Sequence, residues 1–258
     1  AWVYSLSLAV YCTSWTFFGA VGQAAEQLWS FLPIYLGPII LLLTMPWVLQ
    51  KMVMISKQEN ITSIADFIAA RYGKAQHLAA MVAVVAIIGA LPYIALQLKA
   101  VAMSVQVLSD AGLGSAFPTS DTALWTSLLL AALAILFGTR QIDATEHHQG
   151  LMLAIALESA VKLLALIAVA VFAGIALYQQ PGDWVSDPRL DKLLRPDSLP
   201  TGFLAQALLA FLAMICLPRQ FHVAVVECNE VEQVRQSPLW FGLYLVLIIA
   251  AVLPIAAW

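Results

Sequence analysis

Long, nearly uninterrupted apolar runs alternate with short polar stretches along the whole 258-residue chain. A helix needs about 20 consecutive apolar residues to cross the hydrocarbon core of a bilayer. Runs of approximately this length occur at 1–22, 31–50, 78–108, 122–138, 150–178, 202–218 and 239–258. The pattern predicts an all-α fold, a polytopic transmembrane helix bundle of about seven helices that forms a single domain over residues 1–258.

The amino-acid composition also indicates a chain that lies in a membrane rather than in water. Hydrophobic residues make up 62% of the chain and charged residues 10%, with a mean hydropathy of +0.88. Soluble domains carry about 25% charged residues, so a soluble globular protein is excluded. The net charge of -3 and the pI near 5.7 lack the basic excess of a nucleic-acid-binding domain. We therefore expect the lipid bilayer, and no nucleic acid, as a partner.

The stretch 7–25 does not have the pattern of a plain membrane span. It begins as an apolar helix and then places small polar side chains at mid-membrane depth, namely Cys12, Thr13, Ser14 and Thr16. Glycines follow at both ends of 19–22. We predict that the helix is broken at these glycines, because a helix that only spans lipid needs neither feature.

A second interruption is expected far downstream, in 201–222. Pro218 removes a backbone donor and frees a carbonyl at depth, while Arg219 and Gln220 offer donors beside it. Alternatively, Pro218 only ends the span and Arg219 extends to the interface. Two broken hydrophobic helices in corresponding halves point to the binding site of a transporter.

Polar residues also occur inside other spans. Tyr93 and Gln97 are four residues apart and share one helix face, which lines a polar cavity or packs the bundle through interhelical hydrogen bonds. Glu158 and Lys162 are spaced for an ion pair within one helix. We interpret them as a self-neutralised pair, with a gate or ion relay as the alternative.

The polar segments predict connectors and an orientation. In 60–71, Ser63 and Asp66 have near capping-box spacing, and Gly73 follows as a stop, which indicates a short surface helix. Lys and Arg are more numerous in 51–77, 138–149 and 219–238, seven against three in the opposite loops. We expect these segments on the cytoplasmic side and the long loop 179–200 outside. A solvated interfacial cluster, rather than a metal site, is expected from Arg140, Asp143, Glu146, His147 and His148.

Catalytic motifs are missing from the sequence. It contains no phosphate-binding glycine loop, no nucleophile elbow and no zinc-ligand spacing, so we expect no enzyme activity from this chain itself. Both ends of the sequence lie within apolar runs, and we expect it to be a fragment of a longer protein.

Several segments together resemble a known family. The segment 8–19 (LAVYCTSWTFFG) is similar to the first core helix of the sodium:solute symporter family. Further similarity covers the rest of the chain, in NITSIADFIAAR (60–71), LPYIALQLKA (91–100), TEHHQGLMLAIALESAVK (145–162) and LPRQFHVAVVE (217–227). These segments resemble one branch more specifically, the symporter-like N-terminal membrane module of bacterial sensor histidine kinases.

The resemblance implies a partial LeuT-type inverted-repeat fold, with the seven spans as the first seven core helices. Sodium in this family lies between backbone carbonyls of the first core helix, which match Ala9 and Cys12, and hydroxyls of an eighth helix outside this chain. Tyr11 stands where some family members carry an acid, a departure that argues against tight sodium coupling. Solute is expected against the two breaks and the shared helix face, at Thr13, Ser14, Trp15, Tyr93, Gln97, Pro218, Arg219 and Gln220.

The function implied is a module of the bacterial inner membrane that binds, and in a carrier transports, a small polar solute together with Na+. An amino acid such as histidine is the expected solute. In a two-component sensor, the module is the sensory input to cytoplasmic kinase domains of the same chain. The alternatives are a stand-alone Na+-coupled carrier with no signalling role and a membrane scaffold without a ligand.

Overall fold

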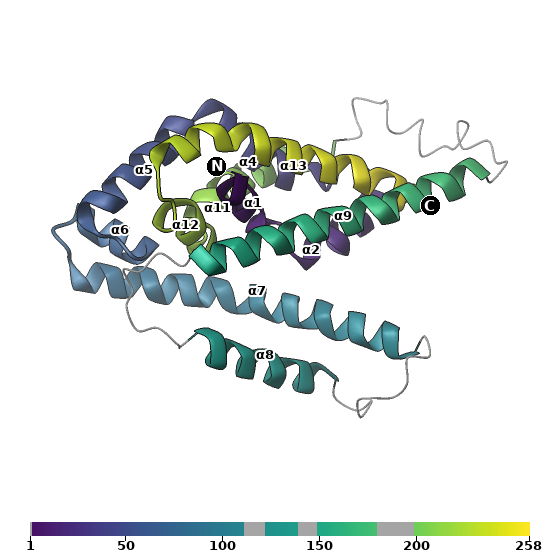
Figure 1. The fold of residues 1–258 in the computed structure, drawn as a ribbon, viewed down its shortest axis with the longest axis horizontal. Helices are drawn as coiled ribbons and strands as arrows, with labels where there is room; N and C mark the ends of the chain where they lie inside the picture. Colours follow the sequence, from purple (N-terminus) through teal and green to yellow (C-terminus); the bar gives the residue numbers. More distant parts are fainter. Residues whose placement is uncertain (1, 111–121, 139–148, 180–198) are drawn as a thin grey trace.

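The computed structural model describes residues 2–110, 122–138, 149–179 and 199–258, and every regular element within them is helical (Figure 1). The all-α prediction is confirmed for these residues. The elements are α1 (Trp2–Ser7), η1 (Leu8–Tyr11), α2 (Ser14–Phe17), α3 (Gly19–Glu26), α4 (Leu32–Thr44), α5 (Pro46–Glu59), α6 (Ile64–Arg71), α7 (Gln76–Asp110), α8 (Thr122–Gly138), α9 (Gln149–Gln179), α11 (Phe203–Cys216), α12 (Pro218–Phe221), η4 (His222–Val226) and α13 (Val231–Ala257).

Within the described residues, three helices are long and apolar enough to cross a membrane: α7, α9 and α13. Two bent pairs raise this number to five if each pair is one span, namely α4 with α5 and α11 with α12 and η4. The predicted spans at 1–22 and 122–138 fall short of this length, because the first is divided into short helices and α8 has 17 residues. The chain is thus a multi-pass membrane protein by helix length and composition.

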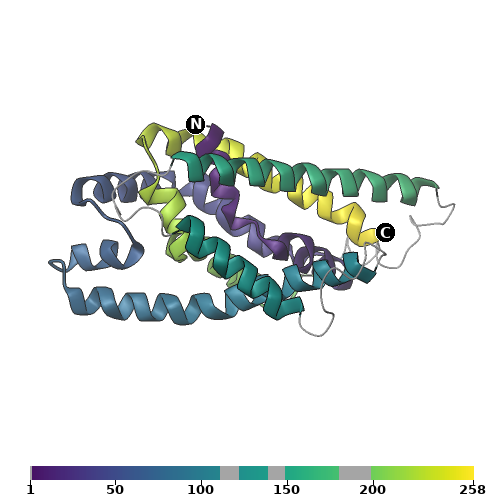
Figure 2. The same ribbon diagram turned by 60° about the horizontal axis from the view of Figure 1, so that its bottom comes forward.

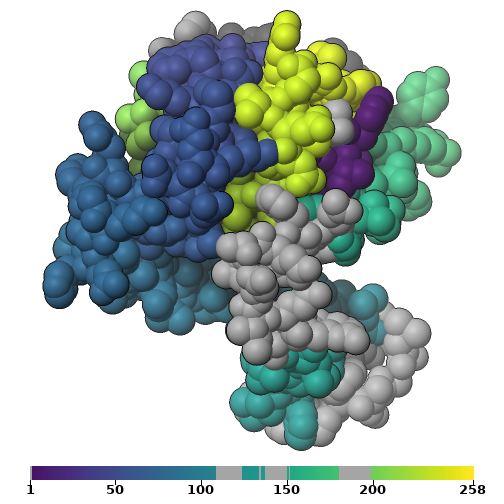
Figure 3. All heavy atoms as spheres, turned by 60° about the vertical axis from the view of Figure 1, so that its left-hand side comes forward, coloured from purple at the N-terminus to yellow at the C-terminus, as the bar shows by residue number. Residues whose placement is uncertain are grey.

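The first broken helix, α1 to α3, lies inside the bundle. It is flanked by α9 and α13, both of which contact α1 (Figure 1). Figure 2 shows α7 and α9 along opposite sides of the molecule. The start of α13 packs on α5. α8 lies beside α7, away from the bundle that the other helices form (Figure 3).

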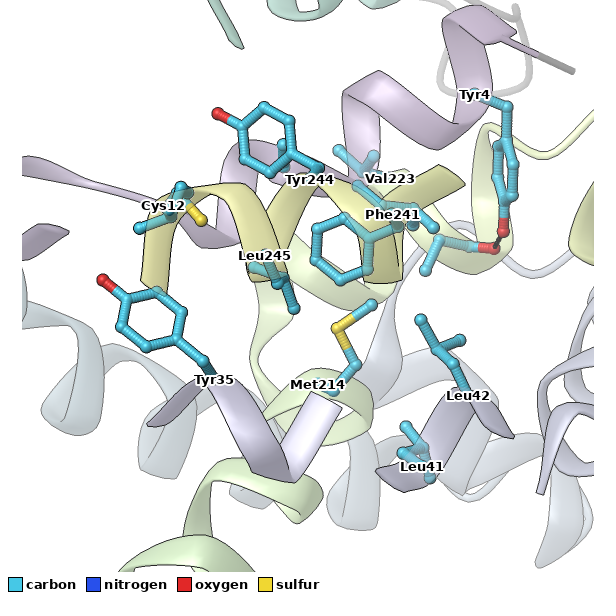
Figure 4. Close-up of a cluster of buried hydrophobic side chains, with 14 of the residues drawn as sticks. Tyr4, Cys12, Tyr35, Leu41, Leu42, Met214, Val223, Phe241, Tyr244 and Leu245 are labelled. Atoms are coloured by element: carbon cyan, nitrogen blue, oxygen red, sulfur yellow. Dashed lines mark hydrogen bonds between the residues drawn. The ribbon is translucent and has the colours of Figure 1, made fainter. Parts of the chain in front are cut away.

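The core is built on one face of α13. Phe241, Leu245, Ile248 and Val252 are all buried, and their spacing places them on one side of a helix. Figure 4 shows side chains of the first broken helix, α4 and α11 converging on this face. The most apolar part of α7, by contrast, has no buried residue within the described protein, which suits a helix bordered by lipid or by further helices.

The first break lies earlier than predicted. Cys12 (φ -82°, ψ 115°) and Thr13 (φ -118°, ψ -167°) are extended and separate η1 from α2. Gly19 is the first residue of α3, directly after Phe18, which separates α2 from α3 but keeps helical angles (φ -94°, ψ -50°). Gly22 lies inside α3, so the glycines themselves do not open the backbone. Gly19 instead permits close packing, because a Cβ at this position would lie 2.4 Å from Trp15 Cδ1.

The second break lies where it was predicted. α11 ends at Cys216, Leu217 is extended (φ -68°, ψ 126°), and α12 begins at Pro218 after a bend of 53°. Proline disfavours the helical conformation in the residue before it and is well accommodated at the first helical position. We call α11, α12 and η4 the second broken helix.

A third break was not predicted. The expected continuous span 31–50 ends at Thr44, Met45 leaves the helical region (φ -130°, ψ 42°), and α5 starts at Pro46 after a bend of 76°. The same proline rule explains it. As a result, 51–59 is helical rather than part of a loop.

The connector helix is confirmed. Ser63 is the N-cap of α6, and its hydroxyl accepts a hydrogen bond from the Asp66 backbone N–H at 3.1 Å. Gly73 follows with φ +69°, in the left-handed region that glycine tolerates. The predicted interfacial cluster of Arg140, Asp143, Glu146, His147 and His148 lies outside the described residues, as does most of 179–200.

Candidate solute-binding site

The break at Cys12 and Thr13 positions the candidate site. The 3-10 turn Leu8–Tyr11 closes with a hydrogen bond from the Cys12 N–H to the Ala9 carbonyl, at 2.8 Å. The extended backbone then turns Ser14 toward α7 and leaves Thr13 on a pocket beside α9 and α13. The break therefore presents polar groups on two sides.

On the α7 side, Gln97 binds the first broken helix. Its Oε1 accepts hydrogen bonds from Ser14 Oγ at 2.5 Å and from the Ser14 backbone N–H at 3.3 Å. The Gln97 Nε2 is buried and has no hydrogen-bond partner among the described residues. A buried donor without an acceptor is destabilising by about 1–3 kcal/mol, so this amide is suited to a ligand that carries an acceptor.

One turn away on the same face of α7, Tyr93 binds the second broken helix. Its hydroxyl accepts a hydrogen bond from Arg219 Nη2 at 3.0 Å, and the guanidinium carbon lies 5.2 Å from the centre of the Tyr93 ring. This combines a hydrogen bond with a cation–π contact. The predicted shared face of Tyr93 and Gln97 thus joins both broken helices.

The two broken helices also contact each other directly. Gln220 is 1% exposed, and its Nε2 donates to the carbonyl of Leu8 at 3.2 Å. Within the part of the chain that the structure describes, the Gln220 Oε1 has no hydrogen-bond partner. A buried amide between the breaks therefore helps to satisfy the interrupted backbone of η1.

Two predicted site residues, Trp15 and Pro218, contribute to the structure through packing and backbone conformation. Trp15 is half-buried, rests on Gly19 and lies 6.4 Å from the Tyr35 ring between centroids. Pro218 is exposed and begins α12. The predicted site residues therefore form two contacts with α7, Ser14 with Gln97 and Arg219 with Tyr93. Gln220 is buried and contacts the first broken helix separately.

The second side of the break was missed by sequence reasoning. A small pocket with room for about one water molecule lies there, between the first broken helix, α9 and α13. Its lining residues are Cys12, Thr13, Thr16, Phe17, Lys162, Leu163, Leu166, Tyr244 and Ile248. We call it the Lys162 pocket. A lysine in the middle of an apolar run was the available signal, but its spacing from Glu158 favoured a simple pair.

The pair itself is present. Lys162 Nζ lies 2.5 Å from Glu158 Oε1 one turn earlier on α9, and the two side chains are 35% and 59% exposed. Lys162 faces the pocket, whereas Glu158 is not among its lining residues. Lys162 therefore lines the pocket with the Glu158 carboxylate directly beside its ammonium.

The two carbonyls expected to hold sodium lie at the first break, on Ala9 within the 3-10 turn and on Cys12 in the extended backbone. The Ala9 carbonyl already accepts the Cys12 N–H, and Cys12 shares its pocket with the Lys162 ammonium. That ammonium is itself paired with the Glu158 carboxylate at 2.5 Å. In the described parts of the chain, no group of three or more His, Cys, Asp or Glu side chains could hold a metal ion, a finding that does not bear on a site made of backbone carbonyls. Sodium at Ala9 and Cys12 stays a prediction of the resemblance.

The groups gathered at the breaks are a hydroxyl, a carboxamide, a phenol and a guanidinium, joined by hydrogen bonds. Such groups bind small polar molecules reversibly. Comparison of the chain with protein-family models, curated proteins and solved structures finds no significant match.

Proposed function

We propose that this chain is a sodium:solute symporter-like membrane module that binds a small polar solute, an amino acid such as histidine, beside its broken helices. One observation carries the proposal. A single face of α7 holds both broken helices, through Gln97 on Ser14 and Tyr93 on Arg219. A solute that inserts at these contacts would act on both breaks at once.

The contacts suit a site that changes state. The Ser14–Gln97 and Tyr93–Arg219 pairs are side-chain contacts between separate helices, and a polar solute can replace either. A ligand shifts an equilibrium only by its different affinity for the two states. Solute binding at the breaks would therefore bias the position of the broken helices against α7, which is the motion expected of a LeuT-type bundle.

In the sensory form of the proposal, this bias passes to cytoplasmic kinase domains of the same chain in a bacterial inner membrane. The module itself then supplies binding and no phosphotransfer. In a carrier, the same motion would expose the solute on each side of the membrane in turn. Both forms need the same binding step, so binding is the property to test first.

The test uses the full-length protein in lipid nanodiscs with labelled amino acids, histidine first. We expect saturable binding that Gln97→Leu weakens at least about tenfold, since the buried Gln97 Nε2 that would donate to the solute is lost. Gln106→Leu is the matched control, because Gln106 is an exposed glutamine of the same helix. Equal binding by both variants would contradict the site.

A second measurement separates receptor from carrier. The full-length protein in proteoliposomes is given labelled amino acids with and without an inward sodium gradient. Uptake that depends on sodium would assign a sodium-coupled carrier. Binding without uptake would assign a receptor. Binding of no amino acid would contradict the proposed function as a whole.

A further inference from the structure

We propose that Trp2, Trp47, Lys51 and Trp240 form one surface that binds the phospholipid headgroups of a bilayer leaflet. We call these four residues the headgroup surface, and none of them belongs to the candidate solute site. Tryptophan is enriched at both interfaces of a membrane, because its ring is apolar and its N–H donor still finds a partner at headgroup level. The positions of exposed tryptophans therefore indicate where the bilayer ends on the chain.

Two tryptophans along α13 are spaced like the two edges of a hydrocarbon core. Trp240 and Trp258 are 18 residues apart, or about 27 Å along a helix, and the hydrocarbon core of a bilayer is about 30 Å thick. Residues 241–257 contain no charged side chain, whereas Glu232 and Arg235 precede Trp240 in the same helix. One membrane interface therefore falls at Trp240.

Trp2 and Trp240 form an aromatic pair at this interface. Their ring centroids lie 3.7 Å apart, and Trp2 is 60% exposed although Tyr4, two residues further along α1, is buried. The pair joins the start of α1 to α13, so both helices reach the same level. In water the exposed ring would leave apolar surface uncovered, whereas lipid covers it at headgroup level.

The bend at Pro46 directs α5 out of the hydrocarbon. The apolar helix α4 has no charged side chain, whereas α5, at 76° to it, carries Lys51, Lys57 and Glu59. Charged side chains are costly in the hydrocarbon, so the change from α4 to α5 marks a second point at which the chain leaves the bilayer. Trp47 lies directly after this bend and is exposed.

One contact relates the depth of Trp47 to that of Trp240. The Lys57 ammonium donates a hydrogen bond to the carbonyl of Asn229, which holds the end of α5 beside the start of α13 (Figure 3). Trp47 lies ten residues before Lys57, and Trp240 lies eleven residues after Asn229. Each distance is about 15–17 Å along a helix, and α5 and α13 pack on each other. The two indoles are therefore at a similar depth, on one side of the bilayer.

Lys51 supplies the charge for a lipid phosphate. It follows Trp47 by four residues, on the same face of α5, and its side chain is exposed. Among the described residues it has no ion-pair partner, and Glu59, the one acid of α5, pairs with Lys74 at 3.4 Å. A lysine one turn outside an interfacial tryptophan extends its ammonium to the headgroups. The headgroup surface thus combines apolar rings with a cation that complements the phosphate.

The first measurement is the depth of single nitroxide labels on the full-length protein in phosphatidylglycerol nanodiscs, with Cys216 and any other exposed cysteine replaced by serine. Labels at the exposed positions of Leu43 and Ala250 should lie in the hydrocarbon, and labels at Gln58 and Glu232 in water. We expect the ratio of oxygen to nickel-chelate accessibility to be at least about tenfold higher for the first two. Equal ratios on α4 and α5, or labels shielded from both reagents by protein, overturn the inference.

The second measurement is the affinity of the full-length protein for phosphatidylglycerol, from lipid adducts in native mass spectrometry. Lys51→Gln should weaken binding at least about threefold, and Lys51→Arg, which keeps the charge, should bind as wild type. Lys74→Gln is the matched control, because Lys74 is an exposed lysine already paired with Glu59. Wild-type affinity in folded Lys51→Gln, or an equal loss in Lys74→Gln, overturns the role of Lys51. The depth measurement leaves the four residues of the surface unaltered, so it remains decisive if Lys51→Gln folds poorly.

Discussion

The hydroxyl of Tyr4, on α1, donates a hydrogen bond to the carbonyl of Ala224, in the π-helical turn η4, over 2.7 Å. The two residues are 220 positions apart, and both are buried. Together with the Gln220–Leu8 contact, this bond ties the first broken helix to the second. The two interrupted helices are therefore coupled by buried polar contacts as well as by α7.

Tyr4→Phe should destabilise the protein by about 1–3 kcal/mol, because the ring is kept and the buried Ala224 carbonyl loses its donor. Thermal unfolding of the full-length protein in detergent measures the change. Tyr178→Phe is the control, since Tyr178 is 86% exposed and should leave the unfolding temperature unaltered. Equal unfolding temperatures for the two variants would show that the Tyr4 bond adds no stability.

Gly37→Ala should disrupt the packing of α4 on α11. A Cβ at Gly37 would lie 2.5 Å from the Phe211 backbone nitrogen and 2.8 Å from the Ala207 carbonyl oxygen, and backbone atoms cannot turn aside as a side chain can. We expect a marked fall in unfolding temperature. Gly242→Ala, inside α13 with nothing within 4 Å of its Cβ, should be neutral or stabilising by up to about 1 kcal/mol. A Gly37→Ala variant as stable as Gly242→Ala would contradict this close approach.

The sequence was most informative where one local rule decides the structure. Apolar runs of membrane length predicted α7, α9 and α13, and Pro218 predicted the second break. The first break was misplaced because glycine lowers helix stability only modestly, and at Gly19 it serves the packing of Trp15. Pro46 carried the same signal as Pro218, but the surrounding apolar run concealed the bend.

The candidate site could be predicted only in part. The spacing of Tyr93 and Gln97 placed both on one helix face, and their partners Ser14 and Arg219 were singled out as polar residues at the breaks. The position of Lys162 beside the first break could not be predicted in the same way. Its neighbours Thr13 and Tyr244 are distant in sequence, so only the packing of α9 and α13 on the first broken helix brings them together.

Ser63→Ala should loosen α6 without affecting the membrane spans. The substitution removes the hydroxyl that accepts the Asp66 N–H, and loss of such an N-cap costs about 1 kcal/mol of helix stability. Hydrogen exchange of the 64–71 amides should accelerate by about five-fold. Ser63→Asp, which keeps an acceptor at the N-cap, should exchange as wild type. Acceleration in both variants alike would exclude capping as the cause.

Removal of the Tyr93–Arg219 contact should free the second broken helix from α7. Tyr93→Phe keeps the ring beneath the guanidinium and loses only the hydroxyl acceptor, whereas Arg219→Leu loses both the hydrogen bond and the cation–π contact. We therefore expect amides of 217–222 to exchange faster in Arg219→Leu than in Tyr93→Phe.

The pairing of these two side chains is isolated by a double-mutant cycle on the same exchange rates, with Tyr93→Leu and Arg219→Leu. Because Arg219 is exposed, the coupling free energy should be about 0.5–1 kcal/mol, the range of a solvent-accessible cation–π pair. Tyr72→Leu replaces Tyr93→Leu as the control, since Tyr72 is an exposed tyrosine that follows α6, and it should show no coupling to Arg219. A coupling free energy of zero between Tyr93 and Arg219 would mean that other contacts hold the second broken helix in place. The hydrogen bond from Gln220 to the Leu8 carbonyl would then be the first contact to remove.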